Sequence, residues 1–179
     1  MAYIDVEIDK ITHSIENVTT GDSFPTEILP LSKPDLVHLT KKNGWKFDWK
    51  MEYLQSDRNV FKLTILWNPT VIQGLISISQ KQGYLEMNLI ESAPFNYGKN
   101  KMHYGVAGNL VAFACKRSLE LGFDGFVAFT AKTVLIDHYR KTLGAISIGG
   151  QRMAIEEKQA LELVKKYFND NKTENHGTD

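Results

Sequence analysis

The stretch GVAGNLVAFACKRSLEL, Gly105 to Leu121, decides how the rest of this chain is arranged. It opens with three small residues, Gly105, Ala107 and Gly108, and continues as an apolar run with helical spacing. Small side chains let a ligand approach the backbone, and a helix start offers unpaired N–H groups and a partial positive charge. The stretch therefore predicts a helix whose beginning, from Gly105 to Asn109, binds a pyrophosphate group.

The loop before this helix, Ser92 to Tyr104, supports the same prediction. Lys99, Lys101 and His103 lie just upstream of the helix and add positive charge there. Aromatic residues lie between the lysines, a pattern that also occurs in proteins that bind nucleic acid. In the whole chain, however, Lys+Arg and Asp+Glu both number 21, so there is no general basic field. We therefore expect a local anion site and not a nucleic-acid partner.

Length and composition are those of one globular domain. The chain has 179 residues, of which 42% are hydrophobic, and this is enough to bury a core. The single cysteine, Cys115, cannot form an internal disulfide and lies in the apolar helix, which favours a small core residue over a nucleophile. No apolar run of about 18 residues and no signal-like N-terminus is present. We expect a soluble cytoplasmic protein with no membrane partner and no metal site.

Three regions divide the chain. Residues 1–31 read as an N-terminal strand or hairpin extension, because Ile4, Val6 and Ile8 alternate with polar residues ahead of a turn signal. Residues 26–168 form the main domain and begin with a further strand. Residues 169–179 contain no apolar side chain, so we expect a disordered tail.

An aromatic cluster follows the first predicted helix, which begins after Ser32 with a proline in its first turn. Trp45, Phe47 and Trp49 lie within five positions of one another. One interpretation is a helix that packs its aromatic side chains on the sheet. The other is a wall or lid over a substrate cleft. For the second interpretation, these three residues are our candidates for acceptor binding.

Three antiparallel strands are predicted next, at Val60–Trp67, Val71–Ser79 and Tyr84–Glu91. In the last strand, Leu85, Met87, Leu89 and Glu91 share one face by simple alternation. Glu91 thus ends an apolar row directly before the loop that leads to the anion site. It is either the solvated end of a strand or a functional carboxylate.

The C-terminal third alternates strands and helices. A buried strand at Phe126–Ala131 leads into a helix at Thr133–Thr142. One strand is then expected from Ile146 past Gly149-Gly150 to Ile155, before a terminal helix at Ile155–Phe168. This order predicts an α/β (α+β) fold with a mixed, mostly antiparallel sheet and helices on both faces.

Two of these segments together resemble a known family. Gly105–Leu110, followed about thirty residues later by His138–Ala145, is similar to the GNAT superfamily of acetyl-CoA-dependent N-acetyltransferases, and the similarity covers roughly residues 60–153. The resemblance implies a GNAT-like fold in which the strands Tyr84–Glu91 and Phe126–Ala131 form a splayed central parallel pair. It also implies acetyl-CoA as the cofactor, with the pantetheine arm between these strands.

The resemblance also places the cofactor on particular residues. Met102 stands where the family's pyrophosphate motif has Gln or Arg, and Lys132 where the family often has Asn. Backbone N–H groups near Leu89 to Glu91 would contact the pantetheine or the acetyl carbonyl. The candidate cofactor-binding residues are Leu89, Ile90, Lys99, Lys101, Met102, His103, Tyr104, Gly105, Val106, Ala107, Gly108, Asn109 and Lys132.

Two residues are candidates for catalysis. Tyr139 matches the family's tyrosine, which implies a general acid that protonates the departing thiolate of coenzyme A, although a core tyrosine is the alternative. An amine attacks in its neutral form, so a base or ordered water is also needed, and Glu91 is the first choice.

The expected activity is transfer of an acetyl group from acetyl-CoA to a primary amine. The acceptor stays open between a small amine or antibiotic, a protein N-terminus or lysine, and an aminoacylated RNA. A catalytically degenerate GNAT-like module that binds coenzyme A, and a nucleic-acid adaptor, are the alternatives from other classes. A homo-oligomer is compatible with the sequence.

Overall fold

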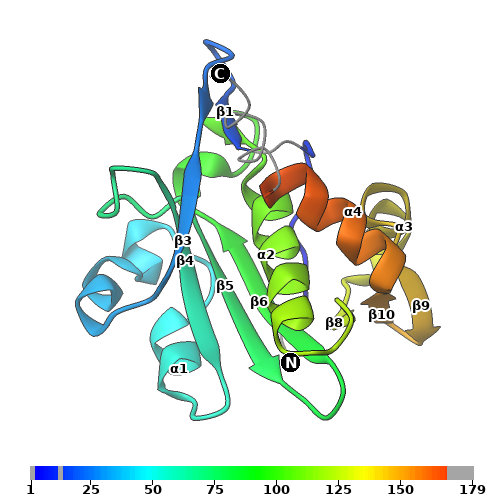
Figure 1. Ribbon diagram of the computed structural model, residues 1–179. Helices are drawn as coiled ribbons and strands as arrows, with labels where there is room; N and C mark the ends of the chain where they lie inside the picture. Colours follow the sequence, from blue (N-terminus) through cyan, green and yellow to red (C-terminus); the bar gives the residue numbers. More distant parts are fainter. Residues whose placement is uncertain (1–2, 12–13, 169–179) are drawn as a thin grey trace, which may run out of the picture.

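The computed structural model describes residues 3–11 and 14–168; the predicted tail, 169–179, lies outside these described residues, as do residues 1–2 and 12–13. Within the described residues the main sheet has seven strands in the order β3-β4-β5-β6-β8-β10-β9 (Figure 1). Neighbouring strands are antiparallel except β6 and β8, which are parallel. The strands are β3 (Thr26–Pro30), β4 (Asn59–Ile65), β5 (Gly74–Gln80), β6 (Leu85–Ser92), β8 (Val127–Thr130), β9 (Ile146–Gly149) and β10 (Arg152–Ile155).

Helices cover both faces of this sheet. On the face toward the viewer in Figure 1 lie α2 (Val106–Glu120) and α4 (Glu157–Phe168), and α3 (Ile136–Leu143) adds side chains to the same core. A second, smaller core holds α1 (Trp49–Leu54) and the turns before it against the other face. The mixed, mostly antiparallel sheet with helices on both faces confirms the predicted fold class.

A small second sheet lies beside the beginning of α2. It has the order β2-β1-β7, with β1 (Ile15–Asn17), β2 (Ser23–Phe24) and β7 (His103–Tyr104). Glu16 pairs with Tyr104 in this sheet, directly before α2 begins. The N-terminal hairpin is therefore packed on the loop that leads into the predicted anion site.

The helix predicted after Ser32 is replaced by shorter elements. The chain forms two 3₁₀ helices, η1 (Lys33–His38) and η2 (Lys41–Asn43), and only then α1. Gly44 ends η2 with a φ of 97°, a conformation that glycine adopts without strain. The chain therefore turns at Gly44 before α1 begins.

The single strand predicted over Ile146–Ile155 is wrong. β9 and β10 are two antiparallel strands, joined by a turn at Gly150 and Gln151 directly after Gly149. Both glycines have positive φ values, 129° and 54°, so the chain turns back on itself here. Glycine pairs of this kind favour a hairpin turn over a continuous strand.

A β-bulge in β6 changes which side chains share a face. Ser77 pairs with Leu89 while Ile78 pairs with Met87, so Asn88 is the extra residue. Leu85 and Met87 consequently join the α2 core, whereas Leu89 joins the α1 core on the other face. The common face predicted for Leu85, Met87, Leu89 and Glu91 is therefore wrong beyond Met87.

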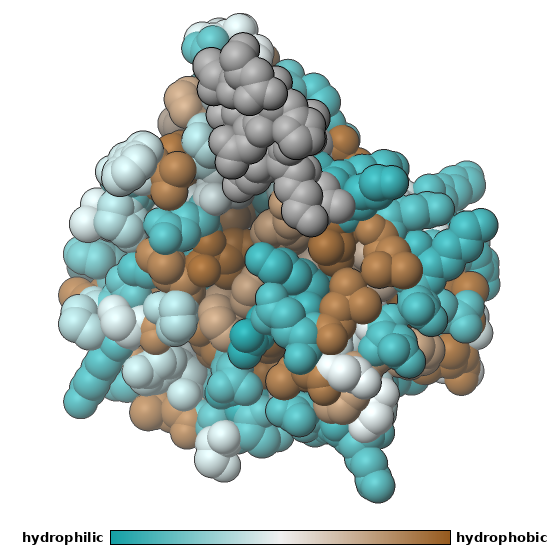
Figure 2. Space-filling view, viewed as in Figure 1, coloured by the Kyte–Doolittle hydropathy of each residue, from teal (hydrophilic) through white to brown (hydrophobic). Residues whose placement is uncertain are grey.

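Apolar side chains also gather on the surface beside α2. Figure 2 shows them over the β3–β5 half of the sheet, where Ile28, Phe61 and Ile65 are only partly buried against the core. Phe61 stacks at a tilt on Phe113 of α2, with 4.8 Å between ring centroids. None of the described helices is both long enough and apolar enough to cross a membrane.

Candidate active site

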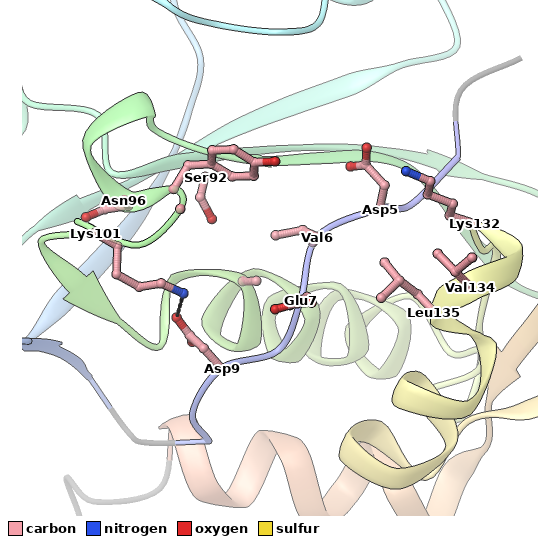
Figure 3. Close-up of a pocket in the computed structure, with 13 residues that line it drawn as sticks. Asp5, Val6, Glu7, Asp9, Ser92, Asn96, Lys101, Lys132, Val134 and Leu135 are labelled. Carbon is pink, nitrogen blue, oxygen red and sulfur yellow. Dashed lines mark hydrogen bonds and ion pairs between the residues drawn. The ribbon is translucent and has the colours of Figure 1, made fainter.

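The central parallel strands separate soon after they begin. β6 and β8 are paired at Leu85–Val127 and Glu86–Ala128, and the pairing ends there. A cavity of about 340 Å³ lies at the carboxyl ends of both strands, with Ser92 and Asn96 on one side and Lys132 and Leu135 on the other (Figure 3). Ligands in α/β sheets bind in such crevices, so we call this region the groove.

Residues 3–11, here called the N-terminal segment, run through the groove (Figure 3). Ile4 forms a parallel bridge with Ala131 and continues the edge of β8. Its N–H donates to the Thr130 carbonyl at 2.8 Å, and its own carbonyl accepts from the Lys132 N–H at 3.0 Å. The segment therefore occupies the β8 side of the splay as an added strand.

The beginning of α2 is also covered by the N-terminal segment. Asp9 accepts a hydrogen bond from the Gly105 N–H at 3.0 Å through Oδ1, and its Oδ2 lies 3.0 Å from Lys101 Nζ. Gly105, with a φ of 90°, is the residue before the first helical turn. An anion does bind at this helix start, as such a terminus favours, but the anion is a carboxylate of the same chain.

The helix start suits a pyrophosphate by its chemistry, but the Gly105 N–H is already bonded to Asp9. All residues from Gly105 to Asn109 are buried. A Cβ added to Gly108 would lie 2.1 Å from Tyr167 Oη and 3.2 Å from the Lys10 carbonyl. Ala107 is the member of this stretch that lines the cavity.

Of the other candidate cofactor residues, Lys101, Lys132 and Ile90 lie at the groove. Lys101 and Lys132 line the main cavity, and Ile90 lines an adjoining cavity of about 270 Å³. Lys99 and Met102 are exposed, and Tyr104 lies under the Lys101 ammonium, 5.8 Å from ring centroid to Nζ. These three do not line either cavity.

Four further candidates have structural partners instead. The His103 Nδ1 lies 3.0 Å from Asn96 Oδ1, and burial lowers the pKa of its imidazole. The Asn109 amide donates to the Ser14 and Gly105 carbonyls, which joins the N-terminal hairpin to α2. Leu89 and Val106 are buried in the two cores. Because neighbours enclose these four side chains, only their backbone groups stay candidates for contacts with a cofactor.

Tyr139 lies at the groove but is fully enclosed, with 0% of its surface exposed. Its hydroxyl donates to the Val6 carbonyl of the N-terminal segment at 2.7 Å, and its ring meets Phe129 edge to face. Burial, and then the nearby charges of Asp5 and Glu7, raise the pKa of the phenol. The phenol is therefore a proton donor that the segment separates from open space.

Glu91 holds the aromatic segment in place. Its carboxylate accepts hydrogen bonds from the Lys46 N–H at 2.7 Å, the Phe47 N–H at 3.2 Å and the Trp49 indole N–H at 2.8 Å. A carboxylate has about four lone-pair sites, so one is left for another donor. Glu91 also lines the smaller cavity, and this places its carboxylate at the boundary between α1 core and groove.

The aromatic residues divide between core and cavity. Trp45 and Trp49 belong to the α1 core, and Trp49 is 0% exposed, so the assignment of these two to an acceptor wall is wrong. For Trp49 the physical reason is its indole N–H, which donates to the buried Glu91 carboxylate and so keeps the ring in the core. Phe47 lines the smaller cavity together with Tyr97 and Pro94.

The sequence interpretation missed the groove residues of the N-terminal segment. Asp5, Glu7 and Asp9 all line the main cavity. The alternation of acidic with apolar residues predicts a strand, but it does not show that the carboxylates line a groove. Nothing local in the sequence indicates which edge that strand joins.

A third cavity, with a mostly polar lining, lies on the α1 face, beside the point where β6 and β8 separate. Its volume is about 760 Å³, and residues of α1, β6, Thr130 and the β9–β10 turn line it. Arg152 binds Glu86 in a two-pronged contact, and Arg58 binds Asn88 and lies 3.4 Å from Glu52. The splay is thus open to a pocket on each face of the sheet.

Comparison of the sequence with protein-family models and with curated proteins finds no match. Solved structures do match the fold. A chimera of the Vibrio cholerae spermidine N-acetyltransferase SpeG and hSSAT aligns with a TM-score of 0.53 and 14% identity, over 76% of this chain and 98% of that chain. A dodecameric structure of the Vibrio cholerae enzyme in an intermediate state aligns with a TM-score of 0.52 and 15% identity, over 76% and 96%. The fold is therefore that of N-acetyltransferases.

Proposed function

We propose that this protein is an acetyl-CoA-dependent N-acetyltransferase that acts on a primary amine. The observation that carries the proposal is the separation of β6 and β8 beside the start of α2, since this geometry joins an anion site to a crevice between two strands. The acetyltransferase fold supports it.

Acetyl-CoA would supply the activated acetyl group, and the chain offers groups to hold it. The N–H groups at Gly105 to Ala107, with Lys101 and Lys132, suit its phosphates by charge and position. Directly after β6, the Ala93 N–H donates to the carbonyl of Gln73, the residue before β5. By strand alternation, the Ile90 and Ser92 N–H groups face the splay, where they can polarise an acyl carbonyl.

Two side chains would move protons. Tyr139 keeps its proton at neutral pH and would donate it to the leaving thiolate once its hydroxyl is free of Val6. Glu91 would accept a proton from the attacking amine through its remaining lone pair, directly or through water.

The acceptor would approach through the polar cavity on the α1 face. Glu52 and Glu86 are carboxylates that line it, and each is matched by an arginine, so the pocket is polar with no large excess of charge. A small amine with both donor and acceptor groups suits this lining. Because some proteins of similar fold are spermidine N-acetyltransferases, and one is a dodecamer, spermidine and oligomeric state are both worth testing.

A screen by mass spectrometry tests the proposal. The protein is incubated with acetyl-CoA and a panel of small amines, spermidine, peptides with free N-termini or lysines, and aminoacylated RNA. We expect a mass increase of one acetyl group on at least one amine. Calorimetric binding of acetyl-CoA without any turnover would instead support the alternative, a degenerate module that binds coenzyme A.

A further inference from the structure

We propose that the N-terminal segment is a built-in competitor of the cofactor, which occupies the groove in the free protein and must leave before acetyl-CoA binds. This inference rests on the proposed function. It would make the N-terminal segment an autoinhibitory part of the chain, and not a fixed wall of the active site.

The contacts of the N-terminal segment follow the whole length of the groove. Ile4 extends the edge of β8, the Val6 carbonyl accepts from the Tyr139 hydroxyl, and Asp9 occupies the start of α2. Between these points, the Ile8 N–H donates to His138 Nε2 at 2.8 Å. A strand edge, the catalytic candidate and the anion site are thus contacted in turn by one short peptide.

The alternation of side chains suits this position. Ile4 and Ile8 are buried in the α2 core, whereas Asp5, Glu7 and Asp9 line the cavity. The cavity also holds Lys101 and Lys132, so the segment presents acidic groups to a partly basic lining. The N-terminal segment is thus an elongated acidic peptide in the groove that we propose for acetyl-CoA, which is itself an elongated anion.

The carboxylates of the N-terminal segment also disfavour binding of the segment and the cofactor at the same time. A phosphate placed in the remaining cavity would add negative charge to a lining that already has three carboxylates, and like charges disfavour one another. Asp9 already takes the Gly105 N–H and Lys101, which are two of the groups that a pyrophosphate needs. Segment and cofactor therefore compete for one site.

Competition of this kind lowers the apparent affinity without changing the site itself. If the segment is bound most of the time, the measured dissociation constant is the intrinsic one divided by the small fraction of open protein. A change that weakens only the closed state tightens acetyl-CoA binding by the same factor. Departure of the segment would also free the Tyr139 hydroxyl from Val6.

Two full-length variants show whether the carboxylate at the start of α2 competes with acetyl-CoA, or whether any negative charge in the cavity has the same effect. Asp9→Ala removes the carboxylate from the start of α2, while Glu7→Ala removes one equal charge from the same cavity. We expect Asp9→Ala to tighten acetyl-CoA binding by about tenfold or more in calorimetry, as the loss of a charge-assisted hydrogen bond in the closed state predicts. Glu7→Ala should tighten it by less than about threefold, the effect of one charge at a distance.

Amide hydrogen exchange on the unmodified protein measures directly whether the N-terminal segment is bound in the groove. The amides of Ile4 and Ile8 are hydrogen-bonded in the closed state and should be protected. Saturating acetyl-CoA should remove that protection while α2 stays protected.

A reversible tether tests whether release is required. Ile4→Cys with Ala131→Cys places two cysteines at the parallel bridge, where a disulfide is geometrically reasonable. The oxidised form should lose acetyl-CoA binding, and reduction should restore it. Restoration on reduction also shows that the variant is folded.

The outcomes separate the two proposals. If the unmodified protein binds acetyl-CoA, Asp9→Ala does not tighten it, and the segment amides stay protected, the competitor is excluded while the proposed function stands. Binding by the oxidised tether would exclude it in the same way. If neither the unmodified protein, nor Asp9→Ala, nor the reduced tether binds acetyl-CoA, both proposals fail together.

Discussion

At the scale of single residues, the side chains at the groove are set by partners far away in the sequence. Glu91 binds a Trp49 indole 42 positions earlier, and Tyr139 donates to Val6, 133 positions earlier. Each of these groups is a reasonable catalytic candidate by chemical type. Each is also tied to a structural partner, so a chemical role has to be separated from a structural one by matched variants.

Tyr139 and His138 provide such a pair. Each makes one hydrogen bond to the N-terminal segment, so loss of either side-chain group loosens the segment. Only Tyr139 is proposed to protonate the thiolate. We therefore expect Tyr139→Phe to lower kcat by at least about tenfold without weakening acetyl-CoA binding, because general acids contribute about 10²- to 10⁴-fold.

His138→Ala is the control for that experiment. It should loosen the segment to a similar degree and leave kcat within about threefold of the unmodified protein. Equal kcat for Tyr139→Phe and the unmodified protein, when chemistry limits turnover, would show that Tyr139 is a core residue only.

At the scale of secondary structure, the start of α2 is a contact point for three segments. Gly108 of α2, Tyr167 of α4 and the Lys10 carbonyl of the N-terminal segment meet there, and Tyr167 Oη lies 3.1 Å from that carbonyl. A glycine inside a helix costs about 1 kcal/mol relative to alanine. The close approach is what makes the glycine necessary at this position.

Gly108→Ala should consequently destabilise the protein, in spite of the better helix propensity of alanine. The new methyl group would collide with Tyr167 Oη, and overpacking of this kind costs about 1–3 kcal/mol. The free energy of unfolding in urea measures it. In a Tyr167→Phe background the loss should shrink by at least half, because the colliding oxygen is absent. The same loss in both backgrounds would show that another contact is responsible.

At the scale of the whole molecule, one sheet joins two cores. Leu75 belongs to the α1 core and its neighbour Ile76 to the α2 core, so β5 contributes to both. The fluorescence of Trp45 and Trp49 reports on the α1 core. The helices α2 and α4, on the other face, supply much of the far-UV circular dichroism. Because the two cores share strands, unfolding of the strands in one core would expose the apolar side chains of the other core to solvent.

We therefore expect a single cooperative unfolding transition. Tryptophan fluorescence and far-UV circular dichroism should give the same urea midpoint within error, as two-state behaviour requires. The measurement is best made on Trp67→Phe, since Trp67 is 90% exposed and would add a signal unrelated to either core. A fluorescence midpoint clearly below the dichroism midpoint would mean that the α1 core unfolds separately.

Much of the fold could be predicted from the sequence, because local patterns encode local structure. The alternation in the β4–β6 region and the apolar run of α2 gave the sheet and the central helix. The bulge at Asn88 could not be predicted, since it depends on how β6 pairs with β5. The hairpin turn beside Gly149 and Gly150 is a local feature that a glycine pair favours, so the continuous strand predicted there was an avoidable error.

The sequence by itself determined that the start of α2 would be an anion site, because small residues at a helix start and nearby lysines are local features. It did not determine which anion would occupy the site. Asp9 reaches Gly105 across 96 positions of the chain, and this contact exists only once Ile4 has joined β8 and Ile8 has entered the core. Occupation of the site by the protein's own carboxylate, in the free protein, is decided by packing, a long-range property that no local pattern in the sequence encodes.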